Sequence, residues 1–503
     1  MKLRAILAFL LTVSTAHAAP VWWESVVNDT KLPIPRMERV LTTACTLTTQ
    51  KSLKPVTARE LTETAVKSLS TFDQKITAAL DGKRVILFAD DKVLKSFSAP
   101  DENDCENWSR LLLAAAVEAR PFSPKAQKAD AEEFYNIFIN AYLGTLDSYA
   151  HFEGDDSTEL TALKNPASIG IRYRRIGRFL EITAILPDSP ASQSDIQIGD
   201  RITAIEGKSV PDLSRVQILN ALRGEAGTTV SLTIRRDGKT RRELLTRRAV
   251  VESPVAYFFD EQSRLMTIKI AAFSKRTVPS LKATLKIAEK QGAKGLIIDL
   301  RGNMGGLLKE AVLAADIFLP PDLLMIRTQG RGEADEQEYW STKKNNRPVY
   351  PTAILVDAKT ASSAEYFAGV LQDYRHATVI GTPTYGKGVL QSVDSVKNAG
   401  ELSVTTARYL LPSGYSPDIY GVFPNICTSG LNLVDIDKVP PAQTRLLPWR
   451  KGTAAIKNKA LRACPRQIRP DNALDDEIAK LFLTDSARYN GALTYFSLDS
   501  FLK

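Results

Sequence analysis

The sequence predicts an α/β protein of several domains, with a mainly helical N-terminal region, a small strand-rich module and a core of stacked β-α-β units. A chain of 503 residues, 44% of them apolar, is long enough for about two to four domains with sizeable cores. Strand-like and helix-like stretches alternate from about residue 254 to 428, as in β-α-β units. Between residues 19 and 152, apolar residues recur at three- and four-residue spacing, which predicts helices.

The first 18 residues have the pattern of a secretory signal peptide. Lys2 and Arg4 precede the apolar run 5–13, and Ala16-His17-Ala18 then offers small residues where a signal peptidase requires them. The run is too short to span a bilayer, and no later stretch has about 18 uninterrupted apolar residues. We therefore expect cleavage near Ala18, an exported protein that is periplasmic or secreted, and no transmembrane anchor.

The helical N-terminal region is expected to extend from 19 to 160, interrupted by a strand pair around an Asp-Asp turn in "KRVILFADDKVLKSFS".

The cysteines indicate how the terminal regions are stabilised. An even number of them in an exported protein favours two disulfides, and four cysteines allow three pairings. The pairs Cys45–Cys105 and Cys427–Cys464 would keep each bridge within one terminal region. None of the spacings resembles a zinc site, and we expect no metal.

The strand-rich module, residues 166–248, contains "SPASQSDIQIGDRITAIEGKSV" and "LRGEAGTTVSLTIRRDGK". These stretches resemble a PDZ domain. The resemblance implies that backbone N–H groups of the loop "SIGIRY" receive a C-terminal carboxylate, while an extended peptide adds as a strand. Ile169 stands where a glycine is common in that loop. This loop places Ile169, Gly170, Ile171 and Arg172 at the expected tail-binding site. Arg223 is a further candidate, because a guanidinium can hold a carboxylate with two hydrogen bonds, and an ordinary surface arginine is the open alternative.

Ser362 stands at the start of a predicted amphipathic helix, in the stretch "SSAEYF". Two interpretations compete for this serine. Ser-x-x-Glu ahead of an apolar run is a capping box, in which Ser362 caps the helix and Glu365 reaches back. A serine at a helix N-terminus is also well placed as a nucleophile, because the next amide and the helix dipole point at the oxyanion that forms.

Two further stretches carry groups that a nucleophilic serine would need. Lys387 lies between two glycines, with Gln391 on the same face of the following strand. A desolvated lysine loses its proton more easily and can act as a general base, and Gln391 could hold its nitrogen. The stretch "DLRGNMGG", 299–306, predicts a strand that ends in a glycine turn with exposed backbone N–H groups. It does not fit a phosphate-binding P-loop.

Histidine is scarce, which limits the catalytic chemistry. The sequence has three histidines, and His17 would leave with the signal peptide. His151 and His376 lie in stretches where a surface or packing role is the better interpretation. The base for a nucleophilic serine is therefore expected to be a residue other than histidine.

Taken together, the motifs resemble the carboxyl-terminal processing proteases, also called tail-specific proteases. The matching stretches occur in the family's order: "DLRGNMGG", "TASSAE", "LQDY", "TYGKGVLQ" and "DIYGVFPNI". The resemblance implies a Ser-Lys protease core at 254–430 with the PDZ domain inserted ahead of it. It assigns the nucleophile to Ser362, the base to Lys387 and the orienting amide to Gln391. The implied oxyanion donors are the amide of Ser363 and one from Gly305 or Gly306.

The sequence departs from the family's pattern at two positions, and the resemblance also implies which partners to expect. Ser363 is a rival nucleophile, and Met304 stands where proline is usual. We expect no cofactor. The expected substrates are proteins or peptides with accessible, apolar C-termini, and a homo-oligomer and an activating adaptor both remain candidate partners.

The alternatives belong to other classes of protein. A catalytically silent PDZ adaptor on a protease-like scaffold is the main one, but it would not need a lysine base. The only candidate for a β-lactamase-type Ser-x-x-Lys pair is Ser341–Lys344, in a polar loop.

The C-terminal region, 431–503, carries nine basic and no acidic residues between 438 and 469. Because the net charge of +9 is mild for this length, we interpret that stretch as a solvated basic face and expect no nucleic-acid binding.

Overall fold

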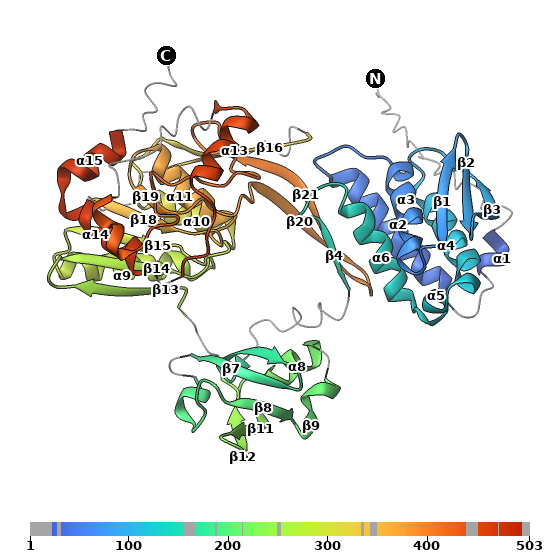
Figure 1. The fold of residues 1–503 in the computed structure, drawn as a ribbon, viewed down its shortest axis with the longest axis horizontal. Coiled ribbons are helices and arrows are strands. Elements are labelled where there is room, and N and C mark those ends of the chain that lie inside the picture. Colours follow the sequence, from blue (N-terminus) through green and yellow to red (C-terminus); the bar gives the residue numbers. More distant parts are fainter. Residues whose placement is uncertain are drawn as a thin grey trace, which may run out of the picture. The chain divides into compact units, whose positions relative to one another are not determined.

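The chain forms two compact units (Figure 1). The first unit comprises residues 1–158 together with 392–404, and the second comprises 159–391 together with 405–503. The expected signal peptide lies outside the described residues. The computed structural model describes residues 23–27, 32–154, 167–186, 189–213, 215–248, 253–332, 336–342, 350–438, 451–470 and 472–494.

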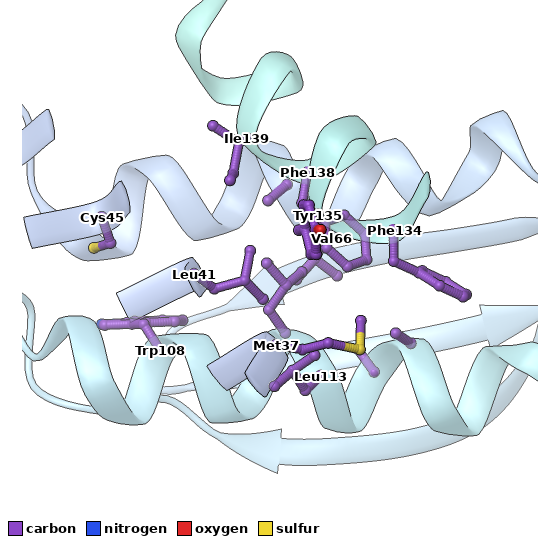
Figure 2. Close-up of a cluster of buried hydrophobic side chains, with 14 of the residues drawn as sticks. Met37, Leu41, Cys45, Val66, Trp108, Leu113, Phe134, Tyr135, Phe138 and Ile139 are labelled. Carbon is purple, nitrogen blue, oxygen red and sulfur yellow. The ribbon is translucent and has the colours of Figure 1, made fainter. Parts of the chain in front are cut away.

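The first unit is mainly helical, as the spacing of apolar residues predicted. Its core contains fully buried side chains from three helices, among them Met37, Trp108 and Phe138 (Figure 2). Burying a side chain of this size stabilises the fold by roughly 1.5–3 kcal/mol. The helices are α1 (Trp23–Val27), α2 (Ile34–Lys51), α3 (Ala58–Lys67), α4 (Cys105–Ala119), α5 (Pro124–Lys128) and α6 (Ala131–Leu143).

A three-stranded antiparallel sheet completes this unit. The predicted strand pair is present as β2 (Arg84–Ala89) and β3 (Lys92–Ser98), and β1 (Ile76–Asp81) pairs with β2 on the other side. Asp90 and Asp91, which form the turn, both have positive φ (48° and 60°). Aspartate tolerates this left-handed conformation better than most residues do, so the Asp-Asp pair explains where the hairpin turns.

Both disulfides pair as the sequence favoured. Cys45 in α2 is bonded to Cys105, the first residue of α4, and Cys427 is bonded to Cys464. Each bridge thus lies within one unit, and the first one ties two core helices together.

The first unit also contains the tip of a long hairpin. Strand β20 (Val389–Val396) begins in the second unit, and strand β21 (Gly400–Leu410) ends there. Residues 392–404 between these two ends, which form the tip of the hairpin, belong to the first unit. Near the tip, β21 pairs with β4 (His151–Gly154). Lys51 forms an ion pair with Asp394 (2.5 Å), and the side chains of Val396 and Leu402 enter the core of the first unit.

The PDZ-like module has its own core, in which Leu180, Ile202 and Val230 are fully buried. Its sheet has the order β12-β11-β8-β7-β6, so β6 is an edge strand that no described strand covers on its outer side. The elements are β5 (Ala167–Ser168), β6 (Ile171–Ile176), β7 (Phe179–Ile185), β8 (Arg201–Ile205), β9 (Lys208–Ser209), α8 (Arg215–Leu222), β10 (Arg223–Gly224), β11 (Thr229–Arg236) and β12 (Lys239–Thr246).

The predicted alternation of strands and helices produces a six-stranded sheet of order β13-β14-β15-β18-β19-β22, parallel except for β13. Strands β15 and β18 are buried at every position, as expected for a parallel sheet covered on both faces. The strands are β13 (Val255–Asp260), β14 (Leu265–Ile270), β15 (Gly295–Asp299), β18 (Thr352–Val356), β19 (Thr378–Gly381) and β22 (Ile426–Cys427).

Different parts of the chain cover the two faces of this sheet. Ile298 packs on the face covered by α9 (Thr277–Lys290), α10 (Leu308–Asp316) and α11 (Ser363–Asp373). Its neighbour Ile297 packs on the opposite face, against side chains of α14 (Ala473–Thr484). A second sheet contains β16 (Leu324–Gly330) and β17 (Glu338–Trp340) beside β21 and β20.

The C-terminal region differs in part from the expectation of a solvated basic face. Helices α14 and α15 (Ser486–Thr494) complete the core of the large sheet, and α13 (Ala454–Ala463) leads to the disulfide at Cys464. Residues 439–450 lie outside the described part. The described end of the basic stretch is bonded to the fold, since Arg469 is 8% exposed and forms an ion pair with Asp475. A count of charges cannot show such partners.

Within the described residues, no helix is both long and apolar enough to cross a membrane.

We predict that replacing Cys45 and Cys105 together by serine loosens the first unit. The bridge closes a loop across 60 positions, and in the chain-entropy model its loss costs about 4 kcal/mol. Amide hydrogen exchange in α2 and α4, followed by mass spectrometry, should therefore accelerate by up to about a thousandfold. Strands β15 and β18 of the second unit serve as the internal control and should keep their protection. Unchanged protection of α2 would contradict a stabilising role for this bridge.

Candidate active site

Ser362 lies on a sharp turn between strand β18 and helix α11. Its backbone has φ 56° and ψ −123°, a strained conformation for a residue with a side chain. In hydrolases of the α/β class, a strained strand-to-helix turn of this kind exposes the hydroxyl of a nucleophilic serine. Ser362 is partly exposed, whereas Ser363 is 2% exposed and its hydroxyl has no hydrogen-bond partner among the described residues. The geometry therefore favours Ser362 over Ser363 as the accessible serine.

Lys387 lies on the loop between β19 and β20. Its Nζ donates a hydrogen bond to Oε1 of Gln391 (2.7 Å), the partner that the spacing suggested. The flanking glycines are required by close packing: a Cβ on Gly388 would lie 2.3 Å from the backbone nitrogen of Asp418, and one on Gly386 would lie 2.6 Å from the Ile419 oxygen. The two glycines thus let the loop lie directly against residues 418–419.

Glu365 connects the serine turn to the lysine loop. Its fully buried carboxylate accepts hydrogen bonds from the backbone N–H groups of Ser362 (2.8 Å), Gly386 (2.7 Å) and Lys387 (2.8 Å), and from the Thr384 hydroxyl. Burial raises the pKa of Glu365 to about 7, and the four donors oppose that rise. The bond from the Ser362 N–H is the glutamate half of the predicted capping box, whereas the bonds to residues 384–387 could not be predicted from the local sequence.

The glycine turn after β15 lies against the serine turn. A Cβ on Gly305 would lie 2.9 Å from the Cβ of Ser362 and 3.1 Å from the amide nitrogen of Ser363. Asn303 fixes this turn, because its backbone oxygen accepts the Ala361 N–H (2.9 Å) and its Oδ1 accepts the Gly305 N–H (2.8 Å). The Gly305 amide is thus already bonded in this structure. Met304, where proline is usual, is 76% exposed.

The side chain of Arg301, which belongs to the same turn, bonds it to other parts of the fold. It forms a bidentate pair with Asp299 (2.9 and 3.0 Å) and bonds the Asn472 oxygen and the Asp476 carboxylate, both at 2.9 Å. These partners lie at the start of α14 or just before it. The buried arginine thus connects the glycine turn to the C-terminal helices.

The C-terminal segment also reaches the lysine loop. The Arg466 guanidinium donates to the backbone oxygens of Thr384 and Ile419, both at 2.7 Å. The disulfide between Cys427 and Cys464 holds this segment two residues upstream. Arg466 is therefore a brace for the loop that carries Lys387, and its place in a basic stretch of the sequence concealed this role.

The two histidines within the described residues, His151 and His376, belong to other segments of the chain than the serine turn. His151 is exposed in β4 of the first unit, where its Nδ1 lies 2.8 Å from the Tyr149 oxygen. His376 follows the C-terminal end of α11, a helix of 11 residues whose other end carries Ser362. At 1.5 Å per residue, this places His376 roughly 15 Å from the serine. The described residues contain no group of three or more His, Cys, Asp or Glu side chains that could hold a metal ion.

The rival serine Ser341 has a structural role. Its hydroxyl donates to the Pro320 oxygen (2.6 Å) and accepts the Leu323 N–H (2.9 Å), and the residue is 4% exposed. Lys344, its proposed partner, lies outside the described residues. The bonds of Ser341 speak against a β-lactamase-type nucleophile there.

The loop of the PDZ-like module requires a glycine at position 170. Gly170 has φ 77°, and a Cβ there would lie 2.1 Å from the Cβ of Ser189, so only glycine fits. The loop leads directly into β6, the edge strand, through Ile171 and Arg172. Ile169 is buried in the module's core. Arg223, in β10, is exposed and pairs with Ser168 of β5, beside the loop.

Comparison with known protein families agrees with this organisation. Residues 264–428 match peptidase family S41, and residues 181–236 match a PDZ domain. The chain is 30% identical over 351 residues to a carboxy-terminal-processing protease of Bartonella bacilliformis, a match that covers 66% of this chain and 78% of that protein. It is 34% identical over 335 residues to a carboxyl-terminal-processing protease of Synechocystis sp., covering 64% and 75% respectively.

A more limited match connects the chain to a probable CtpA-like serine protease of Staphylococcus haemolyticus. The two are 30% identical over 272 residues, which is 54% of either chain. The chain thus spans about half the length of this relative.

We predict that replacing Glu365 by glutamine changes how stability depends on pH. The folded pKa of about 7 lies above the ordinary 4.5, so this carboxyl's contribution to the free energy of unfolding is full below pH 4.5 and is lost as pH rises through 7. Within that window the wild type should lose stability relative to Glu365→Gln by at most about 1.4 kcal/mol per pH unit. Guanidinium unfolding between pH 4 and 8, followed by circular dichroism, measures the difference. Parallel stability curves would contradict the raised pKa.

Proposed function

The chain belongs to peptidase family S41, with the carboxy-terminal processing proteases, and carries a PDZ domain; from this premise we propose that it is an exported serine endopeptidase. It would bind protein substrates by their C-terminal tails and cleave them at a Ser-Lys site. The observation that carries the proposal is that one buried carboxylate, Glu365, bonds the backbones of both Ser362 and Lys387.

In the proposed reaction, neutral Lys387 takes the proton from the Ser362 hydroxyl as its oxygen attacks the scissile carbonyl. The protonated lysine then gives a proton to the leaving amine, and an acyl-enzyme remains. Lys387 then takes a proton from a water molecule as the water oxygen attacks the acyl-enzyme, and it returns that proton to the Ser362 oxygen as the acid product leaves, so that both groups are restored. The bond to Gln391 supports this role, because it fixes the lysine nitrogen on one side (2.7 Å).

The tetrahedral intermediate would place its oxyanion at the N-terminus of α11. The proposed donors are the amides of Ser363 and Gly306, or that of Gly305 once it leaves Asn303. The positive end of the helix dipole adds to this stabilisation. The close packing of Gly305 against Ser362 and Ser363 supports a shared oxyanion site.

Substrate capture would take place on the PDZ domain. Its edge strand β6 can accept an extended peptide as a further strand, with the terminal carboxylate at the loop around Gly170. Arg223, beside that loop, can bind a carboxylate through two hydrogen bonds. Tail binding raises the local concentration of the substrate at the proteolytic site.

The proposed compartment is the periplasm or the cell exterior. Two features support export: the signal-like sequence of residues 1–18, and two disulfides, which persist in oxidising compartments.

We predict that Ser362→Ala and Lys387→Arg each abolish hydrolysis of an unfolded protein with an apolar C-terminus. Alanine lacks the attacking oxygen, and a guanidinium stays protonated at all working pH values, so both changes should lower the rate by about 10⁴-fold or more. Cleavage is followed by mass spectrometry, and circular dichroism checks the fold.

Ser363→Ala is the matched control, because this neighbouring hydroxyl is buried and has no described partner; substantial activity should remain. Full turnover by folded Ser362→Ala, or by folded Lys387→Arg, would refute the proposed mechanism. A wild-type protein that binds tails but never cleaves would instead support an adaptor.

We predict that the substrate's last residues control its cleavage. One unfolded substrate is prepared in three forms: with an apolar C-terminus, with a terminal Asp-Asp, and with an amidated end. The first should be cleaved with the lowest KM, because only it offers both a carboxylate and an apolar side chain. Equal kcat/KM for all three forms would show that the tail is not recognised.

A further inference from the structure

The hydroxyl of Tyr409 contacts both halves of the proposed catalytic pair. Tyr409 lies on β21 and is 1% exposed. Its phenolic oxygen lies 3.0 Å from the backbone oxygen of Ser362 and 3.2 Å from that of Lys387, so that the two carbonyls share its single O–H hydrogen in a bifurcated bond. These two carbonyls belong to residues 25 positions apart in the sequence, so their shared donor is a direct link between the serine turn and the lysine loop.

The surroundings fix this tyrosine in place. Its ring packs edge-to-face on the buried ring of Tyr366 in α11, with centroids 6.4 Å apart and an interplanar angle of 88°. Its backbone N–H donates to the oxygen of Gly388 (3.1 Å), next to the lysine. The hydroxyl is therefore presented by a rigid strand whose backbone is itself bonded to the lysine loop.

Tyr409 and Glu365 bind opposite ends of the same two residues. Oε2 of Glu365 accepts the N–H groups of Ser362 and Lys387, both at 2.8 Å. The Tyr409 hydroxyl donates to the carbonyl oxygens of those residues. Each of the two residues is thus held at its N–H by one side chain and at its C=O by the other, which restricts both its position and its rotation.

This restriction matters most at Ser362. Its φ of 56° is unfavourable for a residue with a side chain, and such a conformation persists only where neighbouring groups over-determine it. The Ser362 oxygen also accepts the N–H of Tyr366 in the first turn of α11. Without the Tyr409 hydroxyl, the turn would keep its helical bond but lose its bond to the strand that borders the lysine loop.

We propose that Tyr409 is a positioning residue of the Ser-Lys site, whose hydroxyl sets the separation and orientation of the Ser362 hydroxyl and the Lys387 amine. This inference rests on the proposed function. Tyr409 touches neither the substrate nor the reacting atoms, and it acts only through the two peptide groups. A misplacement of about 1 Å in a reacting group can cost about a hundredfold in rate, so the loss of this bond should appear in the chemical step.

The test is Tyr409→Phe, which removes one oxygen and keeps the ring. We expect kcat to fall about 10- to 100-fold while KM changes less than twofold, since the tail and its binding site are untouched. The rate at which a small phosphonofluoridate labels Ser362 should fall in parallel, because that reagent needs only the serine and its base. Replacing Tyr409 by 4-aminophenylalanine, which donates from the same position, should restore both rates.

Tyr374→Phe is the matched control. The Tyr374 hydroxyl donates to the Leu324 oxygen (2.6 Å) at the far end of α11, so the control also removes a bond from a tyrosine to a carbonyl. It should retain wild-type kcat, and thermal unfolding measures the loss of stability in both variants. Wild-type kcat in Tyr409→Phe, or an equal loss in Tyr374→Phe, would overturn the proposal.

The 4-aminophenylalanine protein decides the matter even if Tyr409→Phe does not fold: wild-type kcat supports a donor role at this position, and a loss as large as 100-fold in a folded protein refutes it. Ser362→Ala distinguishes a failure of the proposed function from a failure of the role of Tyr409. If Ser362→Ala still cleaves, the proposed function fails; if it is inactive while Tyr409→Phe has wild-type kcat, only the role of Tyr409 fails.

Discussion

The Glu365 carboxylate is the constraint on which the candidate site depends. A carboxylate that is buried away from water is stable only when protein donors replace the lost hydration, and here the donors come from two separate loops. Moving the lysine loop away from the serine turn would leave the carboxylate poorly satisfied. The cost of exposing or orphaning this one group therefore keeps Ser362 and Lys387 together, although no covalent link joins their loops.

The parallel sheet explains why distant stretches of the sequence meet at this carboxylate. Strands β15, β18 and β19 are neighbours and run in the same direction, so the turns that follow them lie at one edge. Asp357 joins two of these turns, because its Oδ1 accepts the Gly302 N–H (2.9 Å). The Thr360 hydroxyl adds a bond to the Leu300 oxygen at the same distance. The site is thus a cross-braced set of turns on a rigid sheet.

The sequence predicted the parts of the fold that depend on local pattern. The alternating core, the helical first unit and the Asp90-Asp91 hairpin follow from periodicity and turn chemistry. Such patterns cannot predict which side chains bond to residues that are distant in the sequence. A tyrosine in a strand such as Tyr409 looks like an ordinary core residue, and a basic stretch looks solvated. Only the fold shows that Arg466 meets two backbone oxygens and Arg469 a buried carboxylate.

The brace formed by Arg466 has a consequence for biogenesis. A ribosome makes the chain from its N-terminus, so the serine turn, the lysine loop and the PDZ domain all exist before residue 466 does. A nascent chain that ends short of the Cys464 bridge lacks the guanidinium on the Thr384 oxygen and the α14 carboxylates on Arg301. The candidate site therefore gains these two supports only after residues 466–476 have been made.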